Sequence, residues 1–286
     1  MTETIHIERL EIGDAVGPTA RFLASAFPAA PHLNSDYLRW LYFDNPAGSA
    51  IACNAMAGDQ IVSHFAITPF RCELFGRQLM AGLALNVATD SGWRRQGLLA
   101  RSGAAAIEAA RAAGLSLLMA VTNRQSTHGF LSRLGFMSIA PLDARIGFGE
   151  TPAPTPAPVE FRVLRDAARI QWRLARPGAT YTVDTSARPP AIYAPSYRWP
   201  LAPVVELARC DANLLPPTLP RRRAGLRPRT WLGLDPGRHW PAWRYRTLPG
   251  RLRPAPLNLV FRSLAAGLAA PGRSGIHFEA FDFDAF

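Results

Sequence analysis

One stretch of about forty residues, 83–121, limits the possible fold more than any other part of the sequence. Residues 83–89 (LALNVAT) form an apolar run typical of a buried strand, and the turn signal Asp90-Ser-Gly92 follows it. Small and apolar residues then recur at helical spacing over residues 98–113, Gly114 ends this helix, and residues 115–121 form a second apolar run. Because a strand, a helix and a strand in this order need a crossover connection, the two strands must run parallel. The sequence therefore predicts an α/β fold.

The turn into the predicted helix is a candidate anion site. The segment Arg94-Arg95-Gln96-Gly97-Leu98-Leu99 lies where the first amides of a helix have no intrahelical acceptor and the helix dipole is positive. Gly97 would let a phosphate approach the backbone closely. The same residues could equally be a charged helix start with a glycine for the turn. The sequence contains neither G-x-G-x-x-G nor G-x-x-x-x-G-K-[ST], so dinucleotide and nucleoside-triphosphate cradles are not supported.

A second motif follows the second strand. Asn123 and Ser126 begin a short predicted helix that ends at Gly135-Phe136, and a further strand follows at 137–139. Together with Arg94-x-x-Gly97-x-Leu99, this order of elements resembles the GNAT superfamily of acyl-coenzyme A dependent N-acyltransferases over roughly residues 35–148. The resemblance implies an α/β fold of mixed type, with a central mixed sheet whose parallel strands splay apart and are flanked by helices. A second domain, rich in Pro and Arg and mostly β, would complete the chain.

Two positions depart from the family pattern. Leu99 stands where the family prefers Gly or Ala, so the approach of a pyrophosphate to the helix could be altered. Leu131 stands where many members have a Tyr that protonates the leaving thiolate. A thiol with a pKa around 8.5 can leave without such an acid.

The resemblance also implies where coenzyme A would bind. The first amides of the helix, with an Arg side chain, would hold its pyrophosphate, and the pantetheine arm would pair with the first strand like an added strand. The residues that the resemblance assigns to the coenzyme are Val87, Ala88, Thr89, Arg94, Arg95, Gln96, Gly97, Leu98, Leu99, Asn123 and Ser126.

The chemistry implied is direct attack of a neutral amine on the thioester, without an acyl intermediate on the protein. A backbone amide near Asn86 or Val87 would stabilise the developing oxyanion. The base candidates are His64 and, second, His128, although a satisfied histidine in a strand is the more usual role for His64. The three cysteines have neither the spacing of metal ligands nor a partner pattern for a nucleophile, so we expect no metal and no disulfide framework.

Composition divides the chain at residues 151–159 (TPAPTPAPV), a Pro/Ala segment that favours an extended linker. We therefore predict a GNAT-like acyl-coenzyme A binding domain at 1–150 and a second domain at 160–286 that shapes the acceptor cleft. A faint similarity between Trp40-Leu-Tyr-x-x-Asn-Pro46 and Trp172-Arg-x-x-x-Pro177 indicates either a degenerate duplication or chance.

The net charge of +11 lies entirely in the second half. Residues 1–150 hold 12 Arg and 12 acidic residues, whereas residues 151–286 hold 20 Arg and 9 acidic residues, and the chain has no Lys. The Arg-rich segment 220–229, with Trp and Tyr after it, could bind a polyanion, or it could be a solvated loop over an aromatic core. Nucleic acid is not the favoured partner, because a general preference for Arg explains the composition as well.

The function that these observations predict is an N-acyltransferase, with acetyl-CoA or another acyl-CoA as co-substrate and a primary amine of a small molecule or sugar precursor as acceptor. The alternative is a catalytically weak GNAT-like binding module whose second half binds a polyanion or an acyl carrier protein. The sequence has no apolar run of the roughly 18 residues that a membrane span needs and no signal segment, which predicts a cytoplasmic protein.

Overall fold

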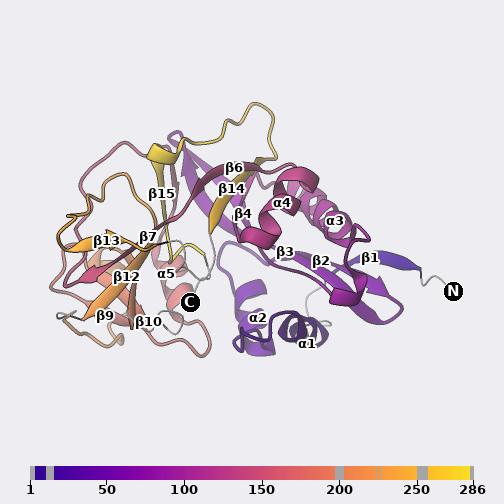
Figure 1. Ribbon diagram of the computed structural model, residues 1–286, viewed down its shortest axis with the longest axis horizontal. Coiled ribbons are helices and arrows are strands. Elements are labelled where there is room, and N and C mark those ends of the chain that lie inside the picture. Colours follow the sequence, from indigo (N-terminus) through magenta and orange to yellow (C-terminus); the bar gives the residue numbers. More distant parts are fainter. Residues whose placement is uncertain are drawn as a thin grey trace.

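Strands from both halves of the chain join one large mixed sheet that helices flank (Figure 1). The computed structural model describes residues 4–10, 16–196, 203–223, 225, 227–249 and 257–283. Its first half contains β1 (Ile5–Arg9), α1 (Val16–Ala26), α2 (Ser35–Tyr42), β2 (Ile51–Ala57), β3 (Gln60–Leu74), β4 (Arg77–Thr89), α3 (Leu98–Ala112), β5 (Leu117–Thr122), α4 (Arg124–Arg133), β6 (Met137–Pro141) and β7 (Asp143–Phe148). Its second half contains β8 (Phe161–Val163), α5 (Ala167–Leu174), β9 (Thr182–Asp184), β10 (Ala191–Pro195), β11 (Val204–Arg209), β12 (Pro228–Leu234), β13 (Tyr245–Thr247), β14 (Asn258–Ser263) and β15 (Ile276–Glu279). The predicted mixed α/β fold is confirmed.

The stretch that led the sequence analysis forms β4, α3 and β5. The two strands pair in parallel, with Ala81–Ala84 opposite Leu117–Ala120. The observed helix, Leu98–Ala112, ends one residue before the predicted end, and Gly114 follows in a left-handed conformation with φ 84°. Apolar periodicity located these elements because their burial depends on neighbours close in sequence.

Helices cover both faces of the first-half sheet (Figure 1). Strand alternation places Phe65 and Ile67 of β3 in a buried cluster with Ile107 and Ala110 of α3. Ala66, between them in sequence, belongs to the cluster with α1 and α2 on the opposite face. The sheet is thus a middle layer between α3 with α4 and α1 with α2.

The second half returns to pair with the first. β14 lies between β5 and β6 and is antiparallel to both, with Val260 opposite Ala120 and Ser138. β8 pairs with β3, and β7 pairs with β12. The predicted linker, residues 151–159, has no helix or strand, and Thr151 and Thr155 bond to second-half groups, Glu206 and Gly237. Strands of both halves thus share one sheet. The division into two domains at residues 151–159 stays a prediction.

The two tryptophans of the faint internal similarity meet face to face. The rings of Trp40 in α2 and Trp172 in α5 stack with centroids 4.7 Å apart. Each indole N–H donates to the other residue's backbone carbonyl, at 2.8 and 3.0 Å. Each is the sixth residue of an eight-residue helix, capped by Asn34 in one case and Asp166 in the other. This reciprocal arrangement joins α2 and α5 at the boundary between the halves.

The helices of the described ranges are too short or too polar for a bilayer span.

Candidate active site

The two central strands of the first half separate where β4 forms a bulge. Parallel pairing with β5 ends at Ala84, although β4 continues to Thr89. On the other side, His64 of β3 pairs with Ala88 and Ala66 pairs with Leu85, so one residue of β3 opposes two of β4. Asn86 has a positive φ of 51°, a conformation that Asn tolerates better than most residues. A bulge of this kind turns the strand and leaves backbone groups available at its edge.

A cleft of about 270 Å³, open to solvent, lies over this separation. Its walls come from the loop between α1 and α2, from β4 and β5, from the start of α4, and from two second-half residues, Leu257 and Phe283. The predicted residues Asn86, Val87, Asn123 and Ser126 line it. Sequence motifs from 86–87 and 123–126 are therefore brought to one site.

The start of α3 provides uncapped amides. Its N-cap is Gly97 in a left-handed conformation, φ 75°, which has no side chain to cap the first turn. A Cβ atom at Gly97 would meet nothing within 4 Å, so the space beside the backbone is open among the described residues. Arg95 also has a positive φ, 65°, and alternation of this kind turns successive amides toward one point. Arg94, Arg95, Gln96 and Gly97 are all exposed, as an anion site requires.

Leu99 does not occupy the space beside these amides. Its side chain packs against α4, where a Cβ on Gly129 would lie 3.3 Å from a Leu99 methyl group. Leu131 is partly buried and packs in the same cluster as Phe130 and Phe136. The bulkier residue at position 99 is thus accommodated by a glycine on the facing helix. At the position where many GNAT members have a Tyr, Leu131 makes apolar contacts instead.

Asn123 caps α4. Its Oδ1 accepts the amides of Gln125 and Ser126, both at 3.0 Å, while Ser126 Oγ accepts the Asn123 amide in return. This capping box fixes the start of α4 at the rim of the cleft. The oxygen of Asn123 is committed to the cap, so the group it can offer a ligand is its Nδ2.

A buried chain of hydrogen bonds supports the bulge. Asn86 Nδ2 donates to Tyr42 Oη at 3.0 Å, and Tyr42 Oη lies 2.8 Å from His64 Nε2. His64 Nδ1 lies 2.7 Å from Asn54 Oδ1, an oxygen that can only accept, so Nδ1 carries the proton and Nε2 accepts from Tyr42. His64 is completely buried, and this burial lowers its pKa to about 3. Burial likewise raises the pKa of Tyr42 above its usual value.

Neither of the two predicted bases, His64 and His128, lines the cleft. His64 does not line the cleft, and Tyr42 stands between its ring and Asn86. His64 therefore contacts Asn86 through Tyr42. His128 is exposed on α4 and does not line the cleft either.

The structure adds a histidine that motif analysis missed. His32, in the loop before α2, is the histidine among the described residues that line the cleft. Its ring packs edge-on against the ring of Tyr37, with the ring centroids 5.0 Å apart. No signal in the sequence pointed to it, because its relation to β4 depends on how the α1–α2 loop folds over the sheet.

Much of the second half's positive charge is internal. Arg238 is buried and donates to Glu206 at 2.6 Å and to Glu279 at 2.9 Å. Arg165 donates to Glu279 and Asp282, both at 2.9 Å. Burial alone would raise the pKa of Glu279, but the Arg165 and Arg238 cations hold it well below its usual range. These arginines stabilise the fold and are not available to a partner.

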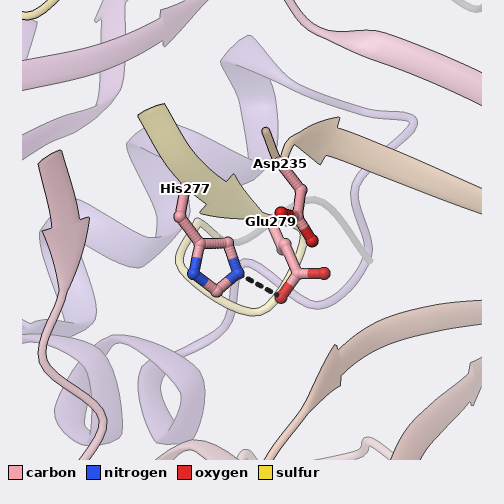
Figure 2. Close-up of side chains that lie close together, drawn as sticks. All are labelled: Asp235, His277 and Glu279. Atoms are coloured by element: carbon pink, nitrogen blue, oxygen red, sulfur yellow. Dashed lines mark hydrogen bonds and ion pairs between the residues drawn. The ribbon is translucent and has the colours of Figure 1, made fainter. Parts of the chain in front are cut away.

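Figure 2 shows the one group among the described residues with the spacing of metal ligands, Asp235, His277 and Glu279. Their ligand atoms lie within 4.8 Å of one another, and His277 Nε2 is 3.1 Å from Glu279. The two carboxylates already accept from Arg238, and Glu279 also accepts from Trp231 Nε1 at 3.0 Å. The charge that a cation would neutralise is therefore already neutralised by arginine.

Comparison with known proteins agrees with this geometry. The sequence profile of the acetyltransferase (GNAT) domain matches residues 15–139. Among solved structures, a GCN5-related N-acetyltransferase from Anabaena variabilis has a TM-score of 0.60 at 10% identity, and Eis1 from Mycobacterium abscessus has 0.57 at 11%. A probable N-acyltransferase from Enterococcus faecalis has 0.55 at 10%. Each match covers 91% of this chain and 73%, 74% and 73% of the other chain, respectively. No curated protein sequence matches the chain.

The mixed sheet and its flanking helices thus have the fold of these solved structures. Residues 15–139 are similar to the acetyltransferase (GNAT) domain. The likeness in fold to the solved structures extends beyond this domain into the second half.

Proposed function

We propose that the protein transfers an acyl group, acetyl in the first instance, from acyl-CoA to the primary amine of a small molecule or sugar precursor. The observation that carries the proposal is the combination of two features in one GNAT domain. The bulged end of β4 diverges from β5 at Asn86, and the uncapped start of α3 lies just after that strand, at Gly97. Within the family, acetyl-CoA is the usual donor.

The residues present fit the coenzyme. Gly97, Leu98 and Leu99 offer amides to a pyrophosphate, and the exposed Arg94 and Arg95 add charge. The first half as a whole is balanced, with 12 Arg and 12 acidic residues, so binding there depends on these local donors and not on net charge.

The pantetheine arm has an unpaired strand edge to follow. Val87 lies at the bulge and lines the cleft, while Ala88 and Thr89 continue β4 beyond the end of its pairing with β5. Asn123 and Ser126 lie on the opposite wall. An extended amide chain placed between these walls would pair with backbone as an added strand does.

The acceptor amine must reach the thioester as a neutral nucleophile. His32 lines the cleft and is our base candidate in place of His64 and His128. A backbone amide at Asn86 or Val87, freed from the β3 ladder by the bulge, would stabilise the oxyanion. The buried Asn54–His64–Tyr42–Asn86 chain holds this backbone in place before the substrate arrives.

A second candidate function rests on the surface arginines. Arg221, Arg222 and Arg223 are exposed and line a hollow with Thr185 and Ser186. This patch could bind a polyanion or the acidic surface of an acyl carrier protein, and the protein would then act as a binding module or take its acyl group from a carrier.

A binding and activity test distinguishes the two. Isothermal titration with acetyl-CoA should show saturable binding, and release of free thiol in the presence of primary amines should exceed hydrolysis alone. Gly97→Glu puts a carboxylate where the pyrophosphate would sit, and we expect it to abolish binding while the circular dichroism spectrum is unchanged. Arg222→Gln, on the distant patch, is the matched control. Acetyl-CoA affinity lost in Arg222→Gln but retained in Gly97→Glu would contradict the proposal.

A further inference from the structure

The cleft has an apolar wall, to which the residues assigned to the coenzyme do not belong. This wall comes from the loop between α1 and α2, from β4 and from the second half of the chain. Its side chains are Phe27, Ala30, Leu33, Leu85, Leu257 and Phe283. The coenzyme residues Val87, Asn123 and Ser126 line the cleft at the bulge and at the start of α4. An acceptor that reaches the thioester from the other side of the cleft therefore meets the apolar wall.

The cleft lining that the structure describes contains no Asp, Glu or Arg side chain. A carboxylate is the group that would balance a cationic acceptor, because a buried cation without an anionic partner is costly. Buried cations elsewhere in the chain do have such partners. Arg238 donates to Glu206 at 2.6 Å, and Arg165 donates to Asp282 at 2.9 Å. The described lining thus provides no counter-charge for a second ammonium group on the substrate.

The polar side chains beside the coenzyme wall are already hydrogen-bonded within the protein. Thr122 Oγ1 donates to the carbonyl oxygen of Asn258 at 3.2 Å. Asn86 Nδ2 donates to Tyr42 Oη at 3.0 Å, and the Ser126 hydroxyl belongs to the capping box of α4. A buried sugar needs a hydrogen-bond partner for each of its hydroxyl groups, because an unpaired polar group loses its bonds to water. These committed side chains therefore do not favour a sugar as the enclosed group.

An apolar wall also helps the reacting amine to lose its proton. Apolar surroundings disfavour the charged form of an ammonium group and so lower its pKa. The lower pKa increases the fraction of neutral amine, which is the form that attacks a thioester. A second ammonium group would carry the same desolvation cost without taking part in the reaction. The wall therefore favours an acceptor with a single amine.

The size of the cleft limits the group that it can enclose. Its volume of about 270 Å³ equals that of about nine water molecules in the liquid, at about 30 Å³ each. This is room for a hexyl chain or a single ring. One side of the space is firmly placed, because Phe283 is 5% exposed and its ring stacks on that of Phe278, with the centroids 5.4 Å apart.

We propose that the acceptor is an apolar monoamine, whose hydrocarbon part packs against the apolar wall while its amine faces the bulge of β4. The inference rests on the proposed acyl transfer and specifies its substrate class. Of the acceptors considered above, it selects a small molecule with one amine over an amino sugar. Polyamines are poor acceptors for the same reason, since their second cation would lie against apolar side chains.

Ala30 and Ala29 provide a matched pair of substitutions. Ala30 lines the cleft with a single methyl group, so Ala30→Asp adds a carboxylate to the apolar wall with little loss of packing. The backbone bonds of Ala30, from its amide to Phe27 and to its carbonyl from Leu33, do not depend on the side chain. Ala29 is exposed and does not line the cleft, so Ala29→Asp adds the same charge one residue away and outside the site.

The test compares hexylamine with 1,6-diaminohexane, which has the same length and a second amine, and with glucosamine as acceptors in acetyl-CoA turnover. For the wild-type protein and Ala29→Asp, we expect kcat/KM for hexylamine to exceed that for either of the others at least tenfold. For Ala30→Asp the ratio of hexylamine to the diamine should fall to one or below, because the new carboxylate pairs with the distal ammonium group. A ratio near one in the wild type, or equal ratios in Ala30→Asp and Ala29→Asp, would overturn the proposal.

Binding of the reaction products separates this inference from the proposed function. N-hexylacetamide, which is uncharged, and N-(6-aminohexyl)acetamide, which keeps one cation, are titrated by calorimetry into the wild type and both variants. The wild type and Ala29→Asp should bind the uncharged product at least tenfold more tightly, whereas Ala30→Asp should bind the cationic product at least as tightly. If this preference is found but no amine is acetylated, the apolar acceptor site stands and the acyl transfer falls. If amines are acetylated without the preference, or neither product binds the wild type, the inference falls and the acyl transfer is judged by turnover alone.

Discussion

His64 should make the free energy of unfolding depend on pH, and the substitution His64→Gln should remove this contribution. Its ring is fully buried and neutral, with a pKa of about 3 in the folded state against 6.5 when unfolded. The unfolded chain therefore binds a proton at His64 between these values, whereas the folded chain does not. By linkage, this stabilises the folded state fully above pH 6.5, and the stabilisation is lost as the pH falls toward 3.

The magnitude follows from the size of the shift. Each pH unit below 6.5 costs about 1.4 kcal/mol of unfolding free energy until the folded pKa is reached. At about pH 5 the loss amounts to about 2 kcal/mol relative to pH 7. Other groups also titrate in this range, so the quantity to measure is the difference between the wild type and a variant without an ionisable group at this position.

The assay is urea unfolding of the wild type and His64→Gln at about pH 7, 6 and 5. His64→Gln should be less stable at pH 7, because it disturbs the bonds to Tyr42 and Asn54, but the gap should narrow by about 2 kcal/mol at pH 5. His6→Gln, at an exposed position, should run parallel to the wild type. A gap that stays constant with pH would refute the assignment of a neutral, buried His64.

Three further substitutions test other parts of the account. Tyr42→Phe removes the hydroxyl that accepts from Asn86 and should lower the free energy of unfolding by about 1–3 kcal/mol. It should also lower kcat, measured by steady-state kinetics, more than it alters acetyl-CoA affinity, measured by calorimetry. Arg238→Gln leaves Glu206 buried without its closest cation and should cost about 3–5 kcal/mol in denaturant unfolding, and a loss below 1 kcal/mol would argue against the ion network. His32→Gln should remove the acid limb of the pH profile of kcat/KM, and an unchanged profile would exclude His32 as the base.

The parts of the fold that depend on local pattern could be predicted from the sequence. The α3 and β5 elements show their burial in apolar runs, and Gly97 and Gly114 flank α3, so both were predicted to within about two residues. The start of β4 was wrong, because the strand begins at Arg77 and not at Leu83. The uncapped amides at the start of α3 were predictable because helix N-termini expose the same amides in every protein.

Long-range arrangement could not be predicted in the same way. Nothing in residues 258–263 indicates that they pair between β5 and β6, because that pairing joins segments more than a hundred residues apart. Net charge also gave no sign that Arg238 and Arg165 are internal, since composition does not distinguish a buried ion pair from a charged surface. The place of His32 in the cleft likewise depends on how distant elements pack.

Backbone hydrogen exchange with and without acetyl-CoA tests the central claim most directly, because it locates the coenzyme without relying on turnover. We predict slower exchange in two segments on adding acetyl-CoA, residues 85–89 at the end of β4 and residues 97–101 at the start of α3. The same addition to Gly97→Glu should leave both segments unchanged. Protection confined to the surface patch of Arg221, Arg222 and Arg223, with none in the two segments, would contradict the proposed coenzyme site.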